Sequence, residues 1–434
     1  MGPRLFQRPG PAANLVLRGV RVLDPEAGID EVRDLVVRDG VIGGDARGLQ
    51  EVDAAGKVVI PGLVDPHVHL RTPGREYTED IASGSRAAAA GGFTAILAMP
   101  NTQPVVDNSA VLGALIDLAA RDAVVPVGFY AAITVGQRGA ELTEQAELAQ
   151  MGAVGFSDDG RPVASAAVMR RALQYQRLAD RPLVLHEEDP TLVAGGCAHE
   201  GAMASRLGLG GMPSIAESVA VARDAALAEY EDASIHICHV SAAETVEEIR
   251  RAKARGVRIT AEVTPHHLVL TDRTLQELDP RRHKMNPPLR EESDRQALIA
   301  GLVDGTLDCV ATDHAPHDAD EKDVPFEEAP FGVIGLETAF AACYTHLVKP
   351  GHLDLPTLVR RMSAAPATAL GLRAPTLADG AQADLALVDL EAVETVVETG
   401  FQSKSRNSAF LGEALAGRVL LTIAGGQVAW KASA

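Results

Sequence analysis

The residues of most chemical interest are histidines and carboxylates that close short apolar segments far apart in the chain. The run LVDPHVHL places His67 and His69 two positions apart at its end. Residues two apart on a strand point to the same side, so both imidazoles can bind one metal ion. Neutral imidazole is a good zinc ligand. The chain therefore contains a candidate metal site that begins with this pair.

Further apolar segments end in the same kinds of side chain. His186 closes PLVLHEED, His239 closes SIHICHVS, and Asp313 lies in LDCVATDHAPH. A carboxylate beside a metal ion can also accept and deliver a proton, so Asp313 is a candidate general acid–base group. Asp158 and Asp159 close AVGFSDDG. Adjacent residues on a strand point to opposite sides, so we expect only one of these two acids to join the others.

Other histidines in these segments receive different interpretations. His236 lies three positions before His239, so alternation turns it to the other side, where we expect a structural role. The same alternation turns His314 away from Asp313. His266 and His267 end a further segment and are assigned no specific role.

The elements that must position these residues recur with a regular spacing. Near-continuous apolar segments alternate with amphipathic helical runs, at residues 63–70, 93–100, 125–133, 153–160, 182–189, 234–241, 257–268 and 307–317. This alternation predicts a parallel sheet covered by helices, and eight repeats favour a closed (β/α)8 TIM-type barrel. A doubly wound open sheet is the alternative, but no GxGxxG follows any segment. In a barrel the carboxyl ends of all strands meet at one face, which would gather the candidate residues there.

The two ends of the chain resemble each other in type. Residues 14–23 and 34–44, and again 383–390 and 419–430, are apolar, β-branched runs with Gly-containing turns, which predict hairpins. We therefore expect a small β-sandwich module formed from both termini, residues 1–61 and 374–434, flanking a barrel at 62–373. The first dozen residues are expected to be a loose arm, and the stretch 187–233 to hold extra helices or a loop.

The composition is that of an ordinary globular chain. Its 434 residues are 46% hydrophobic and 23% charged, with a formal net charge of −19. Because phosphate contacts need clustered cations, nucleic acid and anionic membranes are poor partners. No apolar run approaches the roughly 20 residues of a membrane span, and the N-terminus lacks the apolar run of a signal peptide. The four scattered cysteines form no CxxC pair, so we expect a cytoplasmic location and small, buried thiols.

Together these motifs resemble the amidohydrolase superfamily and, within its cyclic amidohydrolase group, the bacterial type I dihydroorotases. The similarity covers nearly the whole chain from about residue 14, and its most specific pieces are HVHLR, MPNT, GFSDDGRPV, HEED, HICHVS, MNPPLR, ATDHAPH and PFGVIGLET. The resemblance implies reversible hydrolysis of the cyclic amide of (S)-dihydroorotate to N-carbamoyl-L-aspartate, a step of pyrimidine biosynthesis.

The resemblance also implies a zinc site that holds one or two ions, with these ligands: His67, His69, Asp159, His186, His239 and Asp313. Many relatives bridge two metals with a carboxylated lysine at the end of the fourth strand, and GFSDDG offers no lysine. An aspartate takes this place in the type I enzymes. The family pattern selects Asp159, with Asp158 as the alternative.

For the substrate, the resemblance implies a clamp on the exocyclic carboxylate made by Arg71, Asn101 and His317. A guanidinium can make a bidentate fork to such a group. The amide edges of the ring would be bound by Asn286 and by the backbone at Phe331 and Gly332.

Two rival functions remain at this stage. The first is another cyclic amidohydrolase, a hydantoinase or allantoinase, although these typically use the carboxylated lysine that is missing here. The second is a non-catalytic relative that serves as a partner of aspartate carbamoyltransferase, although such proteins have lost metal ligands that this chain retains. We expect a homo-oligomer, and an active complex with aspartate carbamoyltransferase stays open.

Overall fold

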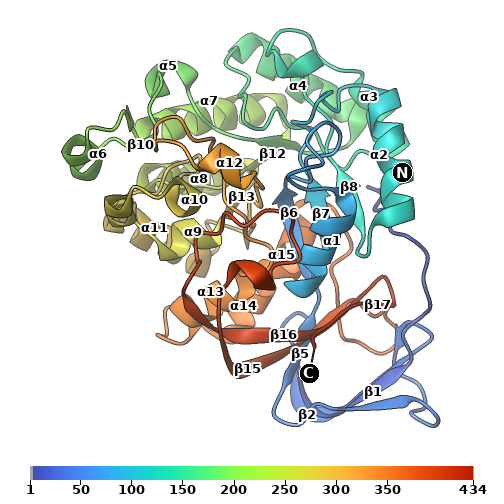
Figure 1. The fold of residues 1–434 in the computed structure, drawn as a ribbon. Helices are drawn as coiled ribbons and strands as arrows, with labels where there is room; N and C mark the ends of the chain where they lie inside the picture. Colours follow the sequence, from blue (N-terminus) through green and yellow to red (C-terminus); the bar gives the residue numbers. More distant parts are fainter. Residues whose placement is uncertain (1–2, 434) are drawn as a thin grey trace.

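Strands from the N-terminal and C-terminal regions of the chain form one sheet at one end of the molecule (Figure 1). The computed structural model describes residues 3–433. The strands of this sheet are β1 (Leu15–Asp24), β2 (Ile29–Arg38), β3 (Val41–Ile42), β4 (Gln50–Asp53), β5 (Val58–Pro61), β15 (Leu385–Thr395), β16 (Ala414–Ala424) and β17 (Gln427–Lys431). Their order is β17-β16-β15-β5-β1-β2-β3, with β4 beside β1. The prediction of a β module from both termini is confirmed, but the pairing gives one eight-stranded sheet instead of two separate layers.

Tight turns connect neighbouring strands of this terminal sheet. Asp39 and Gly40 join β2 to β3 with φ angles of +52° and +74°, and Gly425 and Gly426 join β16 to β17 with +59° and +76°. Two consecutive positive φ angles are the requirement of a type I′ hairpin, which Gly and Asp satisfy at low steric cost. These residues explain why the hairpin signals in the sequence were reliable.

Parallel pairings connect the apolar segments of the central region in chain order. One sheet contains β6 (Leu63–Val68), β7 (Phe93–Ala98) and β8 (Val127–Phe129), and another contains β9 (Leu183–Leu185), β12 (Ser234–Ile237), β13 (Arg258–Val263) and β14 (Cys309–Val310). Single-residue parallel bridges join the two sheets: Phe156 pairs with Ala131 and Leu183, and His314 pairs with Val68. The segment 153–160 thus contributes one bridging residue, with two bridges, where a longer strand was expected. The pairings run through all eight segments and return to the first.

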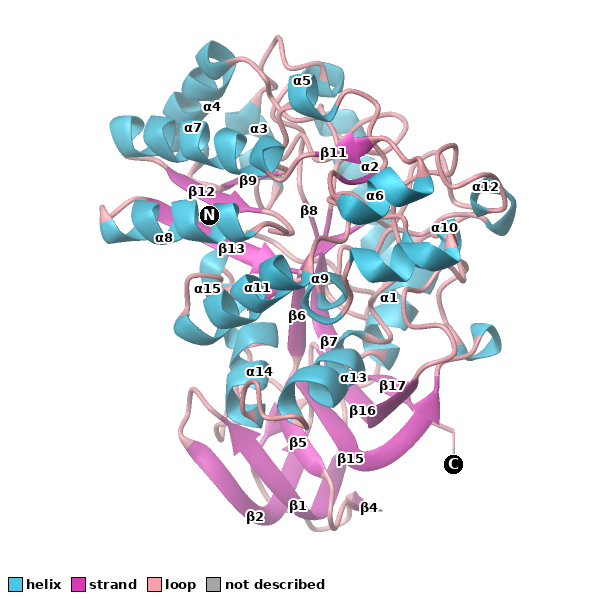
Figure 2. Ribbon diagram, turned by 90° about the vertical axis from the view of Figure 1, so that its left-hand side faces the viewer, coloured by secondary structure: helices cyan, strands magenta, loops and turns pink. Residues whose placement is uncertain are grey.

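Helices lie outside these strands, as Figure 2 shows. The connecting helices are α1 (Ile81–Ala90), α2 (Ser109–Asp122), α3 (Gln145–Met151), α4 (Ala166–Ala179), α7 (Ile215–Glu231), α8 (Ala243–Ala254), α11 (Glu292–Asp304), α14 (Leu355–Met362) and α15 (Ala364–Ala369). Shorter elements occupy the loops: α5 (Pro190–Val193), β10 (Ala198–His199), α6 (Ala202–Leu207), β11 (Gly211–Met212), α9 (Pro265–Val269), α10 (Pro280–His283), α12 (Ala319–Lys322) and α13 (Ala339–Cys343). The extra helices expected at 187–233 are therefore present.

The strands are buried on both faces, which explains their apolar sequences. Every residue of β6, β7, β8 and β9 is buried, as expected for strands covered by helices on one side and packed together on the other. Within residues 3–433, no helix combines the length and apolar character needed to cross a membrane.

The N-terminal segment is not the loose arm that its Arg and Pro content suggested. Phe6 N–H donates to Val127 O at 2.8 Å, and Val127 N–H donates back at 2.9 Å. The Gln7 amide donates to Val124 O and to Ala424 O. Phe6 also packs against the main core, so these contacts hold the segment against both the central region and the terminal sheet. Residues 1 and 2 lie outside the described part of the chain.

Candidate metal centre and substrate site

The candidate ligands all lie at or just after the carboxyl ends of parallel segments. His67 lies in β6 with His69 just after it, His186 follows β9, His239 follows β12, and Asp313 follows β14. Because parallel strands present these ends at one edge, residues separated by hundreds of positions in the sequence come together.

Backbone strain marks this edge. Arg71, His239 and Asp313 have φ angles of +55°, +31° and +48°. A residue with a side chain rarely adopts this left-handed region, which costs on the order of 1–3 kcal/mol and is often retained at functional sites. The strain allows the chain to turn sharply while these three side chains stay at the edge.

The imidazoles and carboxylates form one buried cluster. His67 Nε2 lies 3.4 Å from Asp313 Oδ1, and His69 Nε2 lies 3.0 Å from the same oxygen. His186 Nδ1 lies 2.9 Å from His239 Nε2. All of the candidate ligands are at most 6% exposed. The sequence-predicted metal residues are thus brought together without exception.

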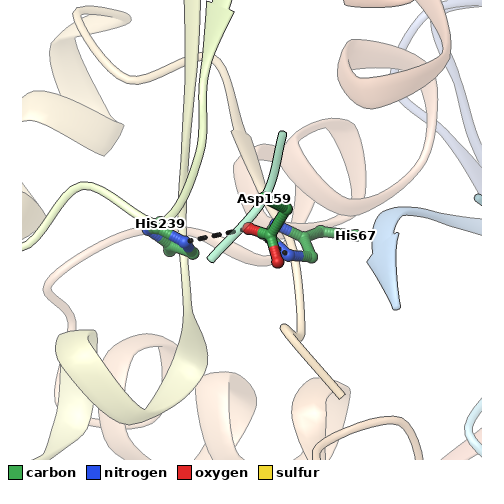
Figure 3. A group of neighbouring side chains, drawn as sticks. All are labelled: His67, Asp159 and His239. Atoms are coloured by element: carbon green, nitrogen blue, oxygen red, sulfur yellow. Dashed lines mark ion pairs between the residues drawn. The ribbon is translucent and has the colours of Figure 1, made fainter. Parts of the chain in front are cut away.

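Asp159 occupies the centre of the cluster, between His67 and His239 (Figure 3). Its Oδ1 lies 3.6 Å from His67 Nε2, 3.5 Å from His186 Nδ1 and 3.8 Å from His239 Nε2. Its Oδ2 lies 3.7 Å from His69 Nε2. One carboxylate therefore faces both halves of the cluster, where it would be a ligand to any metal ion held there.

Asp158, the alternative, points elsewhere. Its Oδ1 accepts hydrogen bonds from the backbone N–H groups of Ile133 at 2.8 Å and Thr134 at 3.1 Å, and its Oδ2 accepts the Thr134 hydroxyl. These bonds hold the carboxylate on the opposite side of the segment from Asp159, as strand alternation predicts.

The cluster fits a cation by two observations. His67 Nε2 and Asp159 Oδ1 are buried atoms without a hydrogen-bond partner, although buried polar atoms are nearly always satisfied. Burial acts to lower the pKa of His67, but the negative charges of Asp313, Glu262 and Asp159 outweigh burial, and the pKa rises to about 10. The surroundings thus favour positive charge at the point where donor atoms of two triads converge: His67, Asp159 and His239, and His67, His69 and Asp313.

Glu262 is a functional residue that the sequence reasoning missed. Its carboxylate is fully buried and accepts His67 Nδ1–H at 2.7 Å, His236 Nε2–H at 3.0 Å and the backbone N–H of His239 at 3.3 Å. These contacts turn His67 Nε2 toward the cluster. The available signal was a single Glu in the apolar strand RITAEV. His236 has the structural role that was predicted for it.

Asn101 also holds the cluster. Its Oδ1 lies 2.9 Å from His69 Nδ1, and its Nδ2 donates to Asp159 Oδ2 at 2.9 Å. The side-chain oxygen therefore orients His69 with Nε2 toward Asp313. Its Nδ2 also lies 3.5 Å from the Asp159 carbonyl oxygen, so the predicted contact with substrate would replace this long hydrogen bond.

The predicted carboxylate clamp lies beside the cluster. Arg71 Nε donates to Pro316 O at 3.0 Å, and Arg71 Nη2 lies 3.3 Å from His317 Nε2. Within residues 3–433, no carboxylate forms an ion pair with this guanidinium. Burial and then Arg75 lower the pKa of Arg71 to about 10, so it is charged at neutral pH. Its charge also lowers the pKa of His69, after burial, which shows that the clamp and the cluster interact.

The remaining predicted substrate residues line the same region. Asn286 Nδ2 lies 3.4 Å from His186 Nε2 and donates to Glu188 Oε2 at 3.0 Å. Glu188, which the sequence analysis did not single out, therefore accepts a hydrogen bond from the side-chain amide of Asn286. The Phe331 carbonyl lies 2.7 Å from His317 Nε2.

Gly332 is held tightly in the same loop. Its N–H donates to Lys284 O at 2.9 Å, and its carbonyl accepts from Asn407. Its φ is +128°, and a Cβ there would lie 2.6 Å from the Ala315 Cβ, so only glycine fits.

The other histidines stay outside the cluster. His314 Nε2 lies 3.2 Å from Glu79 Oε2, in agreement with the predicted alternation. His267 Nδ1 lies 2.8 Å from the Thr264 hydroxyl, and His267 Nε2 lies 3.0 Å from Pro287 O. His266 and His267 are 2% and 3% exposed, so they are buried behind the edge of the site.

Comparisons with known proteins identify relatives that match nearly the whole chain. Residues 56–245 match the family described as Dihydro-orotase-like. A dihydroorotase of Anaeromyxobacter sp. (strain K) is 51% identical over 424 residues, which cover 95% of this chain and 97% of the relative. A dihydroorotase of Pelobacter propionicus is 48% identical over 428 residues, which cover 96% of this chain and 100% of the relative.

Solved structures extend the similarity to the three-dimensional fold. An L-hydantoinase (dihydropyrimidinase) from Arthrobacter aurescens has a TM-score of 0.85 at 26% identity, over 96% of this chain and 95% of that structure. The fold is therefore shared with enzymes that act on cyclic amides. About half of the residues are identical to those of the named relatives, over nearly the full length of the chain. The chain therefore belongs to the dihydroorotase family.

Proposed function

We propose that this protein is a dihydroorotase that reversibly hydrolyses the cyclic amide of (S)-dihydroorotate to N-carbamoyl-L-aspartate in pyrimidine biosynthesis. Membership in the dihydroorotase family supports the reaction class. The observation that carries the substrate assignment is the Arg71 guanidinium, which has no carboxylate partner within the described residues and lies against His317 beside the metal cluster. The exocyclic carboxylate of dihydroorotate is the anion that this cation lacks.

The residues that would hold zinc are His67, His69, Asp159, His186, His239 and Asp313. A bound zinc ion lowers the pKa of water toward neutrality and polarises a carbonyl oxygen. Two donor groups share His67, whose Nδ1 is already bound to Glu262, so its Nε2 would serve a single ion. The cluster would hold one or two zinc ions, and Asp159, which faces both halves of it, would be a ligand in either case. Glu262 and Asn101 keep the imidazoles of His67 and His69 turned with Nε2 toward the cluster.

Asp313 is proposed as the proton carrier. Burial raises the pKa of its carboxyl group, but His67 and His69 lower it more strongly, so Asp313 is ionised at neutral pH. It accepts a proton from the attacking water and delivers it to the ring nitrogen when the amide C–N bond breaks. Ring closure follows the same path in reverse.

The clamp residues position the ring. Arg71, Asn101 and His317 bind the exocyclic carboxylate, while Asn286 and the backbone at Phe331 and Gly332 bind the amide edges. Fixing the ring in this way removes translational and rotational entropy from the barrier. In this structure the Asn286 amide is bound to Glu188, the Gly332 N–H to Lys284 O and the Phe331 carbonyl to His317 Nε2. Substrate must therefore displace or share these contacts.

The finer features of the fold and assembly are also proposals. We infer that the circuit of parallel pairings is a (β/α)8 barrel at residues 62–373, flanked by a module of residues 1–61 and 374–434. Its parallel order and return to β6 support this assignment. A homo-oligomer, association with aspartate carbamoyltransferase and a cytoplasmic location stay predictions.

The decisive experiment is an assay of the purified protein with dihydroorotate and with hydantoin, before and after chelation and zinc addition. We expect turnover of dihydroorotate that chelation abolishes and zinc restores. Turnover of hydantoin alone would favour the hydantoinase alternative, whose fold this chain shares. Activity on neither compound after zinc addition would favour the non-catalytic alternative.

A further inference from the structure

Two buried lysines lie beside the candidate substrate site, and the proposed reaction uses neither. The residues Lys284 and Lys322 are 2% and 1% exposed. Within residues 3–433, neither ammonium group forms an ion pair with a carboxylate. Lysines are almost never fully buried without such a partner, because removal of the charge from water is unfavourable. Two buried lysines without carboxylate partners therefore require a physical explanation.

The contacts of the lysines join the two loops that carry the substrate residues. Lys322 Nζ donates to Pro280 O at 2.9 Å and to Lys284 O at 3.1 Å. Lys284 Nζ donates to Phe326 O at 2.6 Å and to Glu327 O at 3.0 Å. Both ammonium groups thus bind only backbone carbonyl groups, which stabilise them without neutralising their charge.

Both lysines are connected to residues of the proposed clamp. Lys284 O accepts the Gly332 N–H, and Lys284 Nζ lies 4.8 Å from the centre of the Phe331 ring. The charge of Lys322 lowers the pKa of His317, after burial and Arg71. The geometry links the same groups: the Lys284 carbonyl that accepts Lys322 Nζ also accepts the Gly332 N–H, and a Cβ on Gly332 would lie 3.1 Å from His317 Nε2.

The charged groups that act on Lys322 are Lys284, Arg71, Asp279 and Glu321. The two carboxylates among them already have other partners. Glu321 binds Arg75 at 2.5 Å and accepts the Tyr77 hydroxyl at 2.9 Å, while Asp279 accepts the Arg281 N–H at 2.9 Å. Glu321 Oε2 also lies 3.3 Å from His317 Nδ1, so one carboxylate stands beside the clamp. Within residues 3–433, however, no carboxylate forms an ion pair with Arg71, Lys284 or Lys322.

We propose that Lys322 is a positioning residue for the anionic substrate: its buried ammonium group supplies positive potential behind Arg71 and His317, and the substrate carboxylate compensates it. This inference rests on the proposed function, since it assumes a carboxylate-bearing ring in the site. It assigns no chemical step to Lys322, which acts on the substrate through the field and through the loop that it holds.

The charge of Lys322 depends on pH near neutrality. Burial and then Lys284 lower its pKa to about 7. Lys322 is therefore charged below pH 7 and loses its charge as the pH rises above 7, whereas a bound carboxylate raises its pKa. Binding of an anionic ring should weaken as the pH rises from 6 to 8, and binding of a neutral ring should not.

The test compares orotate with uracil, which has the same ring without the carboxylate, on the zinc-loaded enzyme by calorimetry at pH 6, 7 and 8. For Lys322→Met we expect orotate affinity to fall by on the order of tenfold at pH 6, with uracil affinity unchanged and the pH dependence lost. KM for dihydroorotate should rise with kcat within about twofold. Lys322→Arg should restore the preference for orotate.

Lys284→Met is the matched control, because it removes a buried ammonium group and two carbonyl hydrogen bonds from the same loops. Lys284 lowers the pKa of Lys322, so its removal should raise that pKa. The variant should therefore keep the preference for orotate, and this preference should disappear only at a higher pH than in the wild type. Equal weakening of orotate and uracil in Lys322→Met would overturn the proposal and leave a purely structural role. Unchanged binding of both would overturn it as well.

The wild-type arm separates this inference from the proposed function. If the wild-type enzyme neither turns over dihydroorotate nor prefers orotate to uracil, the proposed function fails and the role of Lys322 fails with it. If the wild type does both and Lys322→Met retains the preference and its pH dependence, only the role of Lys322 is refuted.

Discussion

Replacement of Glu262 by Gln tests whether a buried carboxylate behind the cluster controls metal binding. Its side chain accepts hydrogen bonds from His67 Nδ1, His236 Nε2 and the backbone of His239, at 2.7, 3.0 and 3.3 Å. His67 and His236 lower the pKa of Glu262 to about 2, although burial raises it. The group is therefore an anion that two imidazole N–H groups share.

Glutamine fills the same volume but offers one acceptor oxygen and no charge. At least one imidazole N–H must then face an NH2 group or lose its partner. A hydrogen bond to a charged group contributes about 1.5–3 kcal/mol, and loss of a residue that orients a metal-binding histidine typically weakens binding by about 10–100-fold. These ranges agree, so we expect Glu262→Gln to weaken zinc binding by about 10–100-fold.

The assay is competition for zinc with a chromophoric chelator, together with zinc content after dialysis and kcat/KM for dihydroorotate. Glu337→Gln is the control, because it also places a carboxamide where a carboxylate accepts N–H groups, here from Gln402 and Ser403. Wild-type zinc affinity in a folded Glu262→Gln protein would refute the reasoning. An equal loss of zinc affinity in Glu337→Gln would indicate that the effect comes from general destabilisation.

Four further outcomes are expected. Arg71→Met should raise KM for dihydroorotate by about 100-fold, the scale of a lost charge-assisted contact of about 3 kcal/mol; a wild-type KM in the folded variant would refute the clamp. Zinc should raise the thermal midpoint of the chelated protein with increasing concentration; a midpoint independent of zinc would contradict binding to the folded state. Gly332→Ala should destabilise the protein more than Gly412→Ala in urea unfolding, because both have positive φ but only at Gly332 does the Cβ clash with Ala315; equal losses would refute this. Burial raises the pKa of Glu337 to about 7, above its ordinary 4.5, so the folded state retains a proton that the unfolded state loses. The contribution of Glu337 to the free energy of unfolding is full below pH 4.5 and falls by up to about 3 kcal/mol as the pH rises to 7. Glu337→Gln should flatten this part of the plot of unfolding free energy against pH, and an unchanged plot would contradict the assignment.

The site was more predictable than the elements that carry it. His67, His69, His186, His239 and Asp313 could be grouped in advance because each closes an apolar segment, and a parallel sheet presents such ends at one edge. The strand bounds were less accurate: segment 153–160 contributes one bridging residue, Phe156, which pairs with both neighbouring segments. Its backbone hydrogen bonds to these neighbours span only residues 154–157, so apolar character alone overstates strand length.

The residues that were missed act through partners distant in sequence. Glu262 lies 195 positions from His67, to which it is bonded, and Lys322 binds Pro280 O, 42 positions away. The N-terminal segment was expected to be loose because it is rich in Pro and Gly and contains no periodic apolar pattern, but Phe6 pairs with Val127. Local composition reports what a segment prefers in isolation and cannot report a partner that only folding supplies.

By itself, the amino-acid sequence determined the chemistry available to this protein: the order of apolar segments, the histidines and acids that end them, and the hairpins of the two termini. These follow from short-range periodicity and residue type. Only the tertiary structure decided which acid of the pair Asp158 and Asp159 faces the cluster, which carboxylate orients His67, and where unpaired positive charge is buried. Orientation and charge balance depend on distances between segments, and no spacing along a chain specifies such distances.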